Sequence, residues 1–386
     1  MFRRICILLL LAVSLAAGSP LSSPFDIYLL ADRFDSTLQA NIDTFHIPGT
    51  AAAIVQGDQV VYSETFGVTS TLHPANVTHS TLFRLASLSK GFSAVLTGKL
   101  VREGLLSWDE SITEILPDSI NPPDQDEAPI TIRNILSQTS GYPAYTGTEL
   151  LEQNLSYAGL LGYLQTVPRI DPPGRQFNYQ NVVFNLISDI ISIKSGLDFD
   201  ACCWDKLFYP LHMYDACVGM EAFVNSHDRA LPHIKVDSLW RATEVKPTYY
   251  HVPAAAGINA SLNDMQSWLG AMLGHDPRVV SPNILAAIMT PYIETDKSSR
   301  YFGAWEHLGQ TWYGMGWRIF DYRDLTLVYH GGYVEGFRAE IVLVPELDLG
   351  LVVMMNAATP FADNCVPMFL ELMYRDHPEP ENSNSQ

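Results

Sequence analysis

Basic residues are scarce in this 386-residue chain, which has 23 Lys and Arg against 42 Asp and Glu and a formal net charge of −19. No run of Lys and Arg occurs along it, so nucleic acid and anionic membrane surfaces are poor partners. Charged residues make up only 17% of the chain and hydrophobic residues 47%, which excludes disordered, collagen-like and coiled-coil proteins. The length predicts one large or two closely packed globular domains, enough to enclose a cleft.

Long hydrophobic runs are also missing, except at the N-terminus. Residues 1–18 combine a basic start, an apolar stretch and small residues up to Gly18, which is the pattern of a secretory signal peptide. The apolar stretch is shorter than the ~20 residues of a membrane-spanning helix, which disfavours the alternative of a membrane anchor. The sequence therefore predicts an exported protein, periplasmic or secreted, with no stable membrane insertion after signal cleavage.

Cysteine is rare as well, and one of the five lies in the predicted signal. The other four are Cys202, Cys203, Cys217 and Cys365. Export permits a disulfide from Cys202 or Cys203 to Cys217, but buried free thiols suit a protein of this size equally well. Their spacing matches no zinc site, and no His-Glu-x-x-His is present. We therefore predict no metal and no cofactor.

The order of secondary-structure signals favours an α+β fold. A helical stretch over residues 25–45 precedes two β-rich runs, at 50–55 and 59–66, which are separated by a Gly-Asp turn typical of a hairpin. Three further β-rich runs follow near the C-terminus, at 325–330, 337–344 and 349–355. The segment between has helical patterns broken by Pro-rich loops. Strands at both chain ends enclosing helices predict one antiparallel sheet built from both ends, rather than alternating βαβ units.

The first chemical motif is a Ser-x-x-Lys at Ser87 and Lys90. If a helix starts near Ser87, residues three apart share a face, so the Lys90 amine neighbours the Ser87 hydroxyl. A serine hydroxyl is a poor nucleophile until a base accepts its proton, and an amine in an apolar, electropositive site can be neutral enough to do so. The same pattern also arises as a helix N-cap followed by a solvated lysine.

Two further motifs favour the catalytic interpretation. A Tyr-x-Asn, Tyr179 and Asn181, follows a Pro-Gly turn; the phenol can share proton transfer, and the amide can bind both a lysine and a substrate carbonyl. A His-Gly-Gly, starting at His330, ends an apolar strand. Glycines there let a substrate backbone lie close to the strand edge.

In this order and at these separations, the three motifs resemble those of the serine β-lactamase and penicillin-binding protein superfamily, specifically its class C β-lactamase-like group. The resemblance extends over nearly all of the chain after the signal, including the segments at residues 135–141, 255–261 and 313–317. It implies a β-lactamase/transpeptidase-like fold over residues 24–376. The sheet part would comprise about 24–90 and 245–376, the helical part about 91–244, and residues 377–386 would be a disordered tail.

The resemblance also implies residue roles. Ser87 would attack an amide or ester carbonyl, Lys90 and Tyr179 would move its proton, and an acyl-enzyme would form and be hydrolysed. The backbone N–H groups of Ser87 and Tyr333 would hold the oxyanion. The substrate-binding residues would be Asn181, His330, Gly331, Gly332 and Tyr333. The partner would be a small-molecule or peptide substrate, such as a β-lactam, a D-amino-acid peptide or a small ester.

Two departures from the family pattern stand out. The third motif usually begins with Lys in β-lactamases, and an unperturbed His at position 330 is only about a quarter protonated at pH 7. The resemblance implies that His330 bonds Tyr179 or an acidic substrate group, and the small protonated fraction implies that a cation for a substrate carboxylate is present only part of the time. Gln138 also replaces the usual His, in a segment interpreted as structural.

Two other functions compete with this one. An α/β-hydrolase is suggested by His-Gly-Gly alone, but no Gly-x-Ser-x-Gly follows it. A non-hydrolytic penicillin- or peptidoglycan-binding sensor on the same fold would keep the motifs, because a fold and its motifs do not guarantee turnover.

Overall fold

The computed structural model describes residues 25–375 except 118, 121–127 and 298–301. The predicted signal peptide at 1–18 and the predicted tail at 377–386 lie outside these residues. Within the described ranges, no helix combines the length and the apolar character needed to cross a membrane.

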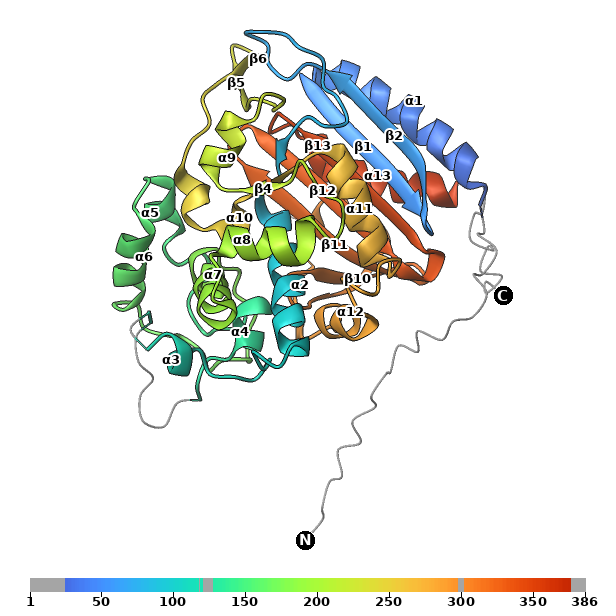
Figure 1. Ribbon diagram of the computed structural model, residues 1–386. Helices are drawn as coiled ribbons and strands as arrows, with labels where there is room; N and C mark the ends of the chain where they lie inside the picture. The colour runs from blue at the N-terminus through green and yellow to red at the C-terminus, as the bar shows by residue number, and fades with distance from the viewer. Residues whose placement is uncertain (1–24, 118, 121–127, 298–301, 376–386) are drawn as a thin grey trace, which may run out of the picture.

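The core of the fold is an eight-stranded sheet in the order β2-β1-β13-β12-β11-β10-β9-β8, with antiparallel neighbours throughout (Figure 1). The strands from the two chain ends meet where β1 pairs with β13, from Thr50 opposite Met355 to Gln56 opposite Leu349. This confirms the predicted α+β architecture. The strands are β1 (Gly49–Gln56), β2 (Gln59–Gly67), β8 (Ile293–Glu294), β9 (Leu308–Tyr313), β10 (Arg318–Tyr322), β11 (Leu325–Val334), β12 (Phe337–Val344) and β13 (Leu349–Met355).

Both faces of this sheet are covered. Because side chains alternate along each strand, neighbouring residues pack into two different cores. In β1, Ala51, Ala53 and Val55 belong to a core shared with the larger helical layer. Ala52 and Ile54 belong to a second core under α1 (Ile27–Phe45) and α13 (Ala362–Tyr374). Strands buried on both faces read as continuous apolar runs, which is why β13 is apolar at nearly every position.

The larger helical layer holds the elements around the predicted site, and α11 packs directly on β1, β13 and β2 (Figure 1). Its helices are α2 (Ser89–Arg102), α3 (Ile112–Ile115), α4 (Ile132–Leu136), α5 (Thr148–Glu152), α6 (Tyr157–Leu164), α7 (Val182–Ser195), α8 (Phe199–Cys203), α9 (Met220–Asn225), α10 (Pro253–Ala256), α11 (Leu262–Met272) and α12 (Pro282–Ile288). Smaller β pairings are made by β3 (Phe83–Arg84), β4 (Cys217–Val218) and β7 (Ile258–Ala260), and by β5 (His233–Val236) and β6 (Leu239–Ala242).

Helix α2 is the central helix of that layer, buried from Ser89 to Leu100 and in contact with α7, α10 and α12. The Trp317 ring packs closely against the start of this helix: a Cβ atom added to Gly91 would lie only 2.5 Å from the nearest ring atom. A larger residue at 91 would therefore displace either the ring or the helix. This close contact ties the beginning of α2, which follows Ser87, to the segment that leads into β10.

His233 has a structural role in the fold: it is buried, it accepts a hydrogen bond from Thr71 N at Nε2 (3.1 Å) and it donates from Nδ1 to Asn356 O (2.9 Å). The four cysteines described by the structure carry free thiols, and burial raises their pKa values. The structure therefore has the free-thiol alternative rather than a disulfide to Cys217.

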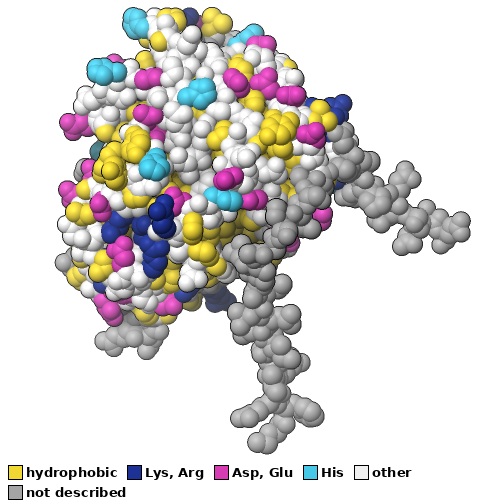
Figure 2. Space-filling model, turned by 45° about the vertical axis from the view of Figure 1, so that its right-hand side comes forward, with side chains coloured by type: hydrophobic (Ala, Val, Ile, Leu, Met, Phe, Trp, Pro, Cys, Tyr) yellow, Lys and Arg dark blue, Asp and Glu magenta, His cyan; other side chains and the backbone are white. Residues whose placement is uncertain are grey.

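The acidic composition is visible on the surface. Figure 2 shows Asp and Glu side chains spread over one face of the molecule, with Lys and Arg confined to a few small groups. This distribution is consistent with poor binding to polyanions.

Candidate active site

Ser87 lies in a short 3-10 turn, η1 (Ala86–Leu88), immediately before α2. Its flanking residues are buried, while Ser87 itself remains partly accessible. The preceding residue, Ala86, has φ of 49°, a left-handed conformation that is unfavourable for a residue with a Cβ. Such strain is typical of functional sites, where surrounding contacts hold the backbone in place. Here the hydrogen bond from Leu85 N to Ile258 O helps to hold it.

Lys90 is completely buried, and its Nζ contacts three oxygens. These are Ser87 Oγ at 3.3 Å, Asn181 Oδ1 at 2.8 Å and the backbone oxygen of Ala255 at 3.0 Å. Burial, with a further contribution from the nearby charge of Arg318, lowers the pKa of Lys90 well below its usual 10.5. An amine in this environment is able to accept a proton.

Tyr179 makes the second side-chain contact described for Ser87. Its hydroxyl donates to Ser87 Oγ at 2.9 Å, and its ring centroid lies 4.8 Å from Lys90 Nζ. Burial raises the pKa of Tyr179 above its usual value, although the hydrogen bond to Ser87 and the charge of Arg318 act in the other direction. The phenol is therefore protonated at neutral pH, and it is a proton donor to the serine oxygen.

Gln138 holds the Tyr179–Asn181 segment through its side-chain amide. Its Oε1 accepts from Gln180 N at 2.7 Å and its Nε2 donates to Gln180 O at 3.1 Å, while its own backbone oxygen accepts from Asn178 N at 2.8 Å. Gln138 has φ of 62°, so its backbone is itself strained. The segment was interpreted as structural, and the structure shows which part of the site it supports.

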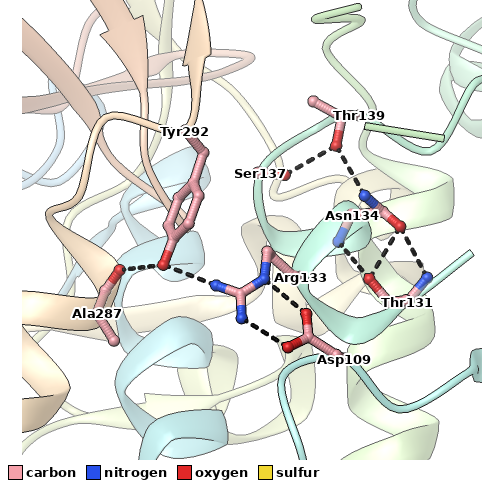
Figure 3. Close-up of polar contacts among 8 residues, drawn as sticks. All are labelled: Asp109, Thr131, Arg133, Asn134, Ser137, Thr139, Ala287 and Tyr292. Atoms are coloured by element: carbon pink, nitrogen blue, oxygen red, sulfur yellow. Dashed lines mark hydrogen bonds and ion pairs between the residues drawn. The ribbon is translucent and has the colours of Figure 1, made fainter. Parts of the chain in front are cut away.

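The residues on either side of Gln138 are held by the polar network drawn in Figure 3. Arg133 on α4 forms a two-bond ion pair with Asp109 (2.8 and 3.0 Å) and donates to Tyr292 Oη at 2.8 Å. Asn134, which caps α4 together with Thr131, donates to Thr139 Oγ1 at 3.3 Å. The loop that carries Gln138 is thereby anchored on both sides.

For the amide or ester hydrolysis that the motifs predict, we expect Gln138→Ala to lower kcat by about 10- to 100-fold with a smaller change in KM, because small displacements of catalytic groups are costly. The measurement is steady-state kinetics together with thermal unfolding, and the exposed Gln153→Ala is the matched control. A variant with a lower melting temperature but normal kcat would show that Gln138 supports the fold alone.

His330 is where the structure departs from the sequence expectation. Its Nε2 lies 3.2 Å from Tyr313 Oη and its Nδ1 lies 2.8 Å from Gly331 O, so Nδ1 donates and Nε2 accepts. Of the two expected partners, Tyr179 is not the one bonded within the described residues, since the two ring centroids are 6.4 Å apart; the acidic substrate group stays a prediction. Burial, with the charges of Arg318 and Lys90, lowers the pKa of His330 well below its usual 6.5. His330 is therefore a neutral ring bonded to Tyr313, and the expected partial positive charge for a carboxylate is absent.

The two glycines after His330 lie on β11 where it contacts η1. A Cβ on Gly332 would lie 2.4 Å from Leu85 O, so the space expected for substrate backbone is taken there by the turn before Ser87. The next side chain, Tyr333, is 58% exposed. The glycines thus bring the strand edge against the serine turn.

Arg318 at the start of β10 is the residue that the sequence interpretation missed. Its charge acts on Lys90, Tyr179 and His330, and its guanidinium carbon lies 5.8 Å from the Tyr179 ring centroid. The only sequence signal was its position directly after the segment at 313–317. Nothing in that segment indicated that an arginine would lie beside Tyr179.

The structure thus brings together Ser87, Lys90, Tyr179 and Asn181 by direct hydrogen bonds. His330, Gly331, Gly332 and Tyr333 form the adjoining strand edge. Among the residues described, no group of His, Cys, Asp and Glu side chains is arranged to hold a metal ion.

An antiparallel sheet flanked by helices, with a Ser-Lys pair at the start of a buried helix, defines the β-lactamase and penicillin-binding class. The sequence model of the family described as Beta-lactamase matches residues 34–367, and the chain belongs to this family. This confirms the resemblance read from the three motifs.

Individual relatives are more distant. The chain is 26% identical over 352 residues to Unguisins hydrolase ungD' of Aspergillus campestris, covering 87% of this chain and 63% of that protein. It is 24% identical over 343 residues to Protein flp of Staphylococcus aureus strain NCTC 8325, covering 86% and 64%. It therefore spans just under two thirds of the length of these curated relatives.

Among solved structures, the octameric penicillin-binding protein homologue from Pyrococcus abyssi superposes with a TM-score of 0.77. The two sequences are 23% identical, and the match covers 91% of this chain and 76% of the other. This similarity establishes the β-lactamase/transpeptidase fold.

Proposed function

We propose that the chain is a serine hydrolase that cleaves an amide or ester through an acyl-enzyme on Ser87. The observation that carries this proposal is the position of Ser87 Oγ between Lys90 Nζ at 3.3 Å and Tyr179 Oη at 2.9 Å. A hydroxyl held between a base and an acid can give up its proton to one group and receive a proton from the other.

Lys90 is the general base in this proposal. A neutral amine has two N–H groups and one lone pair, and Asn181 Oδ1 and Ala255 O accept the two hydrogens. The lone pair is then directed at the Ser87 hydroxyl, which donates its proton to Nζ as Oγ attacks the substrate carbonyl. The lowered pKa of Lys90 keeps a fraction of the amine neutral near pH 7.

Tyr179 is the proton donor. As the tetrahedral intermediate collapses, the phenol or the ammonium of Lys90 protonates the leaving group, and the alcohol or amine departs. In the second half of the reaction water attacks the acyl carbonyl, its proton passes to the same pair, and Ser87 leaves with a proton restored to Oγ. No proton is gained or lost over the cycle.

The oxyanion would lie between the N–H groups of Ser87 and Tyr333. Val334 and Phe337 close the hairpin between β11 and β12, with Tyr333 opposite Arg338. Residues of antiparallel strands alternate between bonded and non-bonded pairs. We therefore expect the Tyr333 N–H to point away from β12, toward the serine turn. Asn181 would bind the substrate carbonyl beside Lys90.

Rapid-quench mass spectrometry tests the proposal with nitrocefin, p-nitrophenyl butyrate and a D-Ala-D-Ala peptide. We expect one equivalent of acyl adduct followed by steady turnover for at least one substrate class. An adduct without turnover would favour the non-hydrolytic penicillin- or peptidoglycan-binding sensor. A protein that forms no adduct and turns over none of the three would contradict both functions.

A further inference from the structure

The hairpin of β11 and β12 is held between the serine turn and α13. Both strands contact η1, and β12 also contacts α13, which belongs to the core on the other face of the sheet. Gly332 approaches the serine turn so closely that a Cβ there would lie 2.4 Å from Leu85 O. The place of the hairpin relative to Ser87 is therefore set from both faces of the sheet.

On the α13 face, charged side chains make part of this contact, although charged residues are rarely buried. Glu340 of β12 is completely buried, and its carboxylate accepts hydrogen bonds from Arg338 at 2.7 Å and from Tyr329 Oη at 2.6 Å. Arg338 also donates to Asp363 of α13 at 2.6 Å. This network, made of Tyr329, Arg338, Glu340 and Asp363, joins β11, β12 and α13.

The network lies at the end of the hairpin that carries the proposed oxyanion donor. Glu340 is paired directly with Gly331 across the two strands, and Arg338 is paired with Tyr333. Only one residue of β11 follows Tyr333. An N–H of Tyr333 that points toward the serine turn, as the proposed function requires, makes no bond to β12. Its place then depends on how the residues opposite it are held.

We propose that Arg338 and Glu340 are positioning residues, which hold the Tyr333 N–H at the oxyanion site through the strand pairing. The inference rests on the proposed hydrolase function. A buried ion pair is weak evidence for a role in stability, because apolar side chains of similar volume often serve as well. Its bonds are directional, however, so they fix the hairpin at one position relative to α13.

The triple variant Tyr329→Phe/Arg338→Met/Glu340→Leu replaces the network by apolar side chains of similar volume. With p-nitrophenyl butyrate we expect kcat to fall about 10- to 100-fold and KM to change less than about 3-fold, because a displaced oxyanion donor mainly weakens transition-state binding. The inhibition constant of phenylboronic acid, which forms a tetrahedral adduct with a serine nucleophile, should rise by a similar factor. Burial raises the pKa of Glu340 to about 7 against the opposing charge of Arg338, so measurements at pH ~8.5 compare the charged network.

Glu340→Gln keeps the shape and an acceptor for Arg338, so a smaller loss of kcat, about 3- to 10-fold, is expected. This variant carries the test if the triple variant does not fold, which thermal unfolding shows. The matched control is Arg323→Gln, which removes an ion pair to Glu371 (3.3 Å) between α13 and the turn before β11. It should keep the wild-type kcat. Normal kcat and normal boronate inhibition in the network variants would overturn the proposal and leave the hydrolase function intact.

Hydrogen exchange separates the positioning role from the hydrolase function, because it requires no turnover. Mass spectrometry of the peptide that contains Tyr333 should show faster exchange in the triple variant than in the wild type, and wild-type exchange in Arg323→Gln. Faster exchange in a protein that hydrolyses no substrate would support the anchoring of the hairpin and contradict the hydrolase. Equal exchange in the wild type and both network variants would overturn the anchoring, whatever the activity.

Discussion

Ser87→Ala is expected to abolish covalent labelling and to lower kcat by about four orders of magnitude or more. Removing the proposed nucleophile would eliminate the proposed acyl-enzyme route itself, so the loss should approach the full contribution of the catalytic residues together. Intact-mass spectrometry after reaction with a β-lactam, a phosphonate or an activated ester should show one adduct in the wild type. Peptide mapping should place it on the peptide that contains Ser87.

The matched control is Ser89→Ala, two residues along the same segment. The Ser89 hydroxyl accepts a hydrogen bond from Ile258 N at 3.0 Å, so its loss should affect stability while labelling persists. An adduct of unchanged stoichiometry in Ser87→Ala would mean that another residue is the nucleophile.

Lys90→Ala should lower kcat by about two to four orders of magnitude, the range for a positioned proton-transfer group. Lys90→Arg should be equally impaired, because a guanidinium cannot lose its proton at accessible pH. The wild type should also lose activity on acidification. In the proposed mechanism the neutral amine is the active form, so kcat/KM should rise with pH through the lowered pKa of Lys90 and level off above it.

Lys99→Met provides the comparison, because Lys99 is a second buried lysine of α2. Its Nζ donates to Val279 O at 3.1 Å rather than to Ser87. A change in stability with little change in kcat is expected there. If Lys90→Ala retained more than a tenth of the wild-type kcat, or kept the same acidic limb of the pH profile, Lys90 would not be the base.

Tyr179→Phe, which removes only the hydroxyl, should cause a loss in the same range as Lys90→Ala.

Much of the architecture could be predicted from the sequence because its signals are local. The hairpin of β1 and β2 and the strands β11 to β13 have apolar β-rich runs bounded by turn residues. α1 presents Leu30, Phe34, Leu38 and Ile42 on one face, which is the helical period. β8 to β10 were not predicted. β8 has only two residues, and a break in register interrupts the pairing of β9 with β10, so neither gives a clear period-two signal.

The identities of the chemical groups at the site also came from the sequence. Spacing alone brought Ser87 and Lys90 together, since three residues are almost one helical turn. The motif order then linked them to Tyr179 and Asn181, which the structure joins to Ser87 and Lys90 by hydrogen bonds. These identities depend on residue type and order, both of which are explicit in a sequence.

Tertiary structure alone decided the charge states and the partners. Whether Lys90 and His330 are protonated depends on burial and on Arg318, which lies far from Lys90 in the chain. The hydrogen bond between His330 and Tyr313 and the hydrogen bonds between Gln138 and Gln180 also join segments that are distant in the chain. A sequence specifies which groups can titrate or bond, but the pKa of each depends on the dielectric environment and charges that distant segments bring to it. For this protein, burial and the charge of Arg318 thereby lower the pKa values of both Lys90 and His330, which their motifs alone did not indicate.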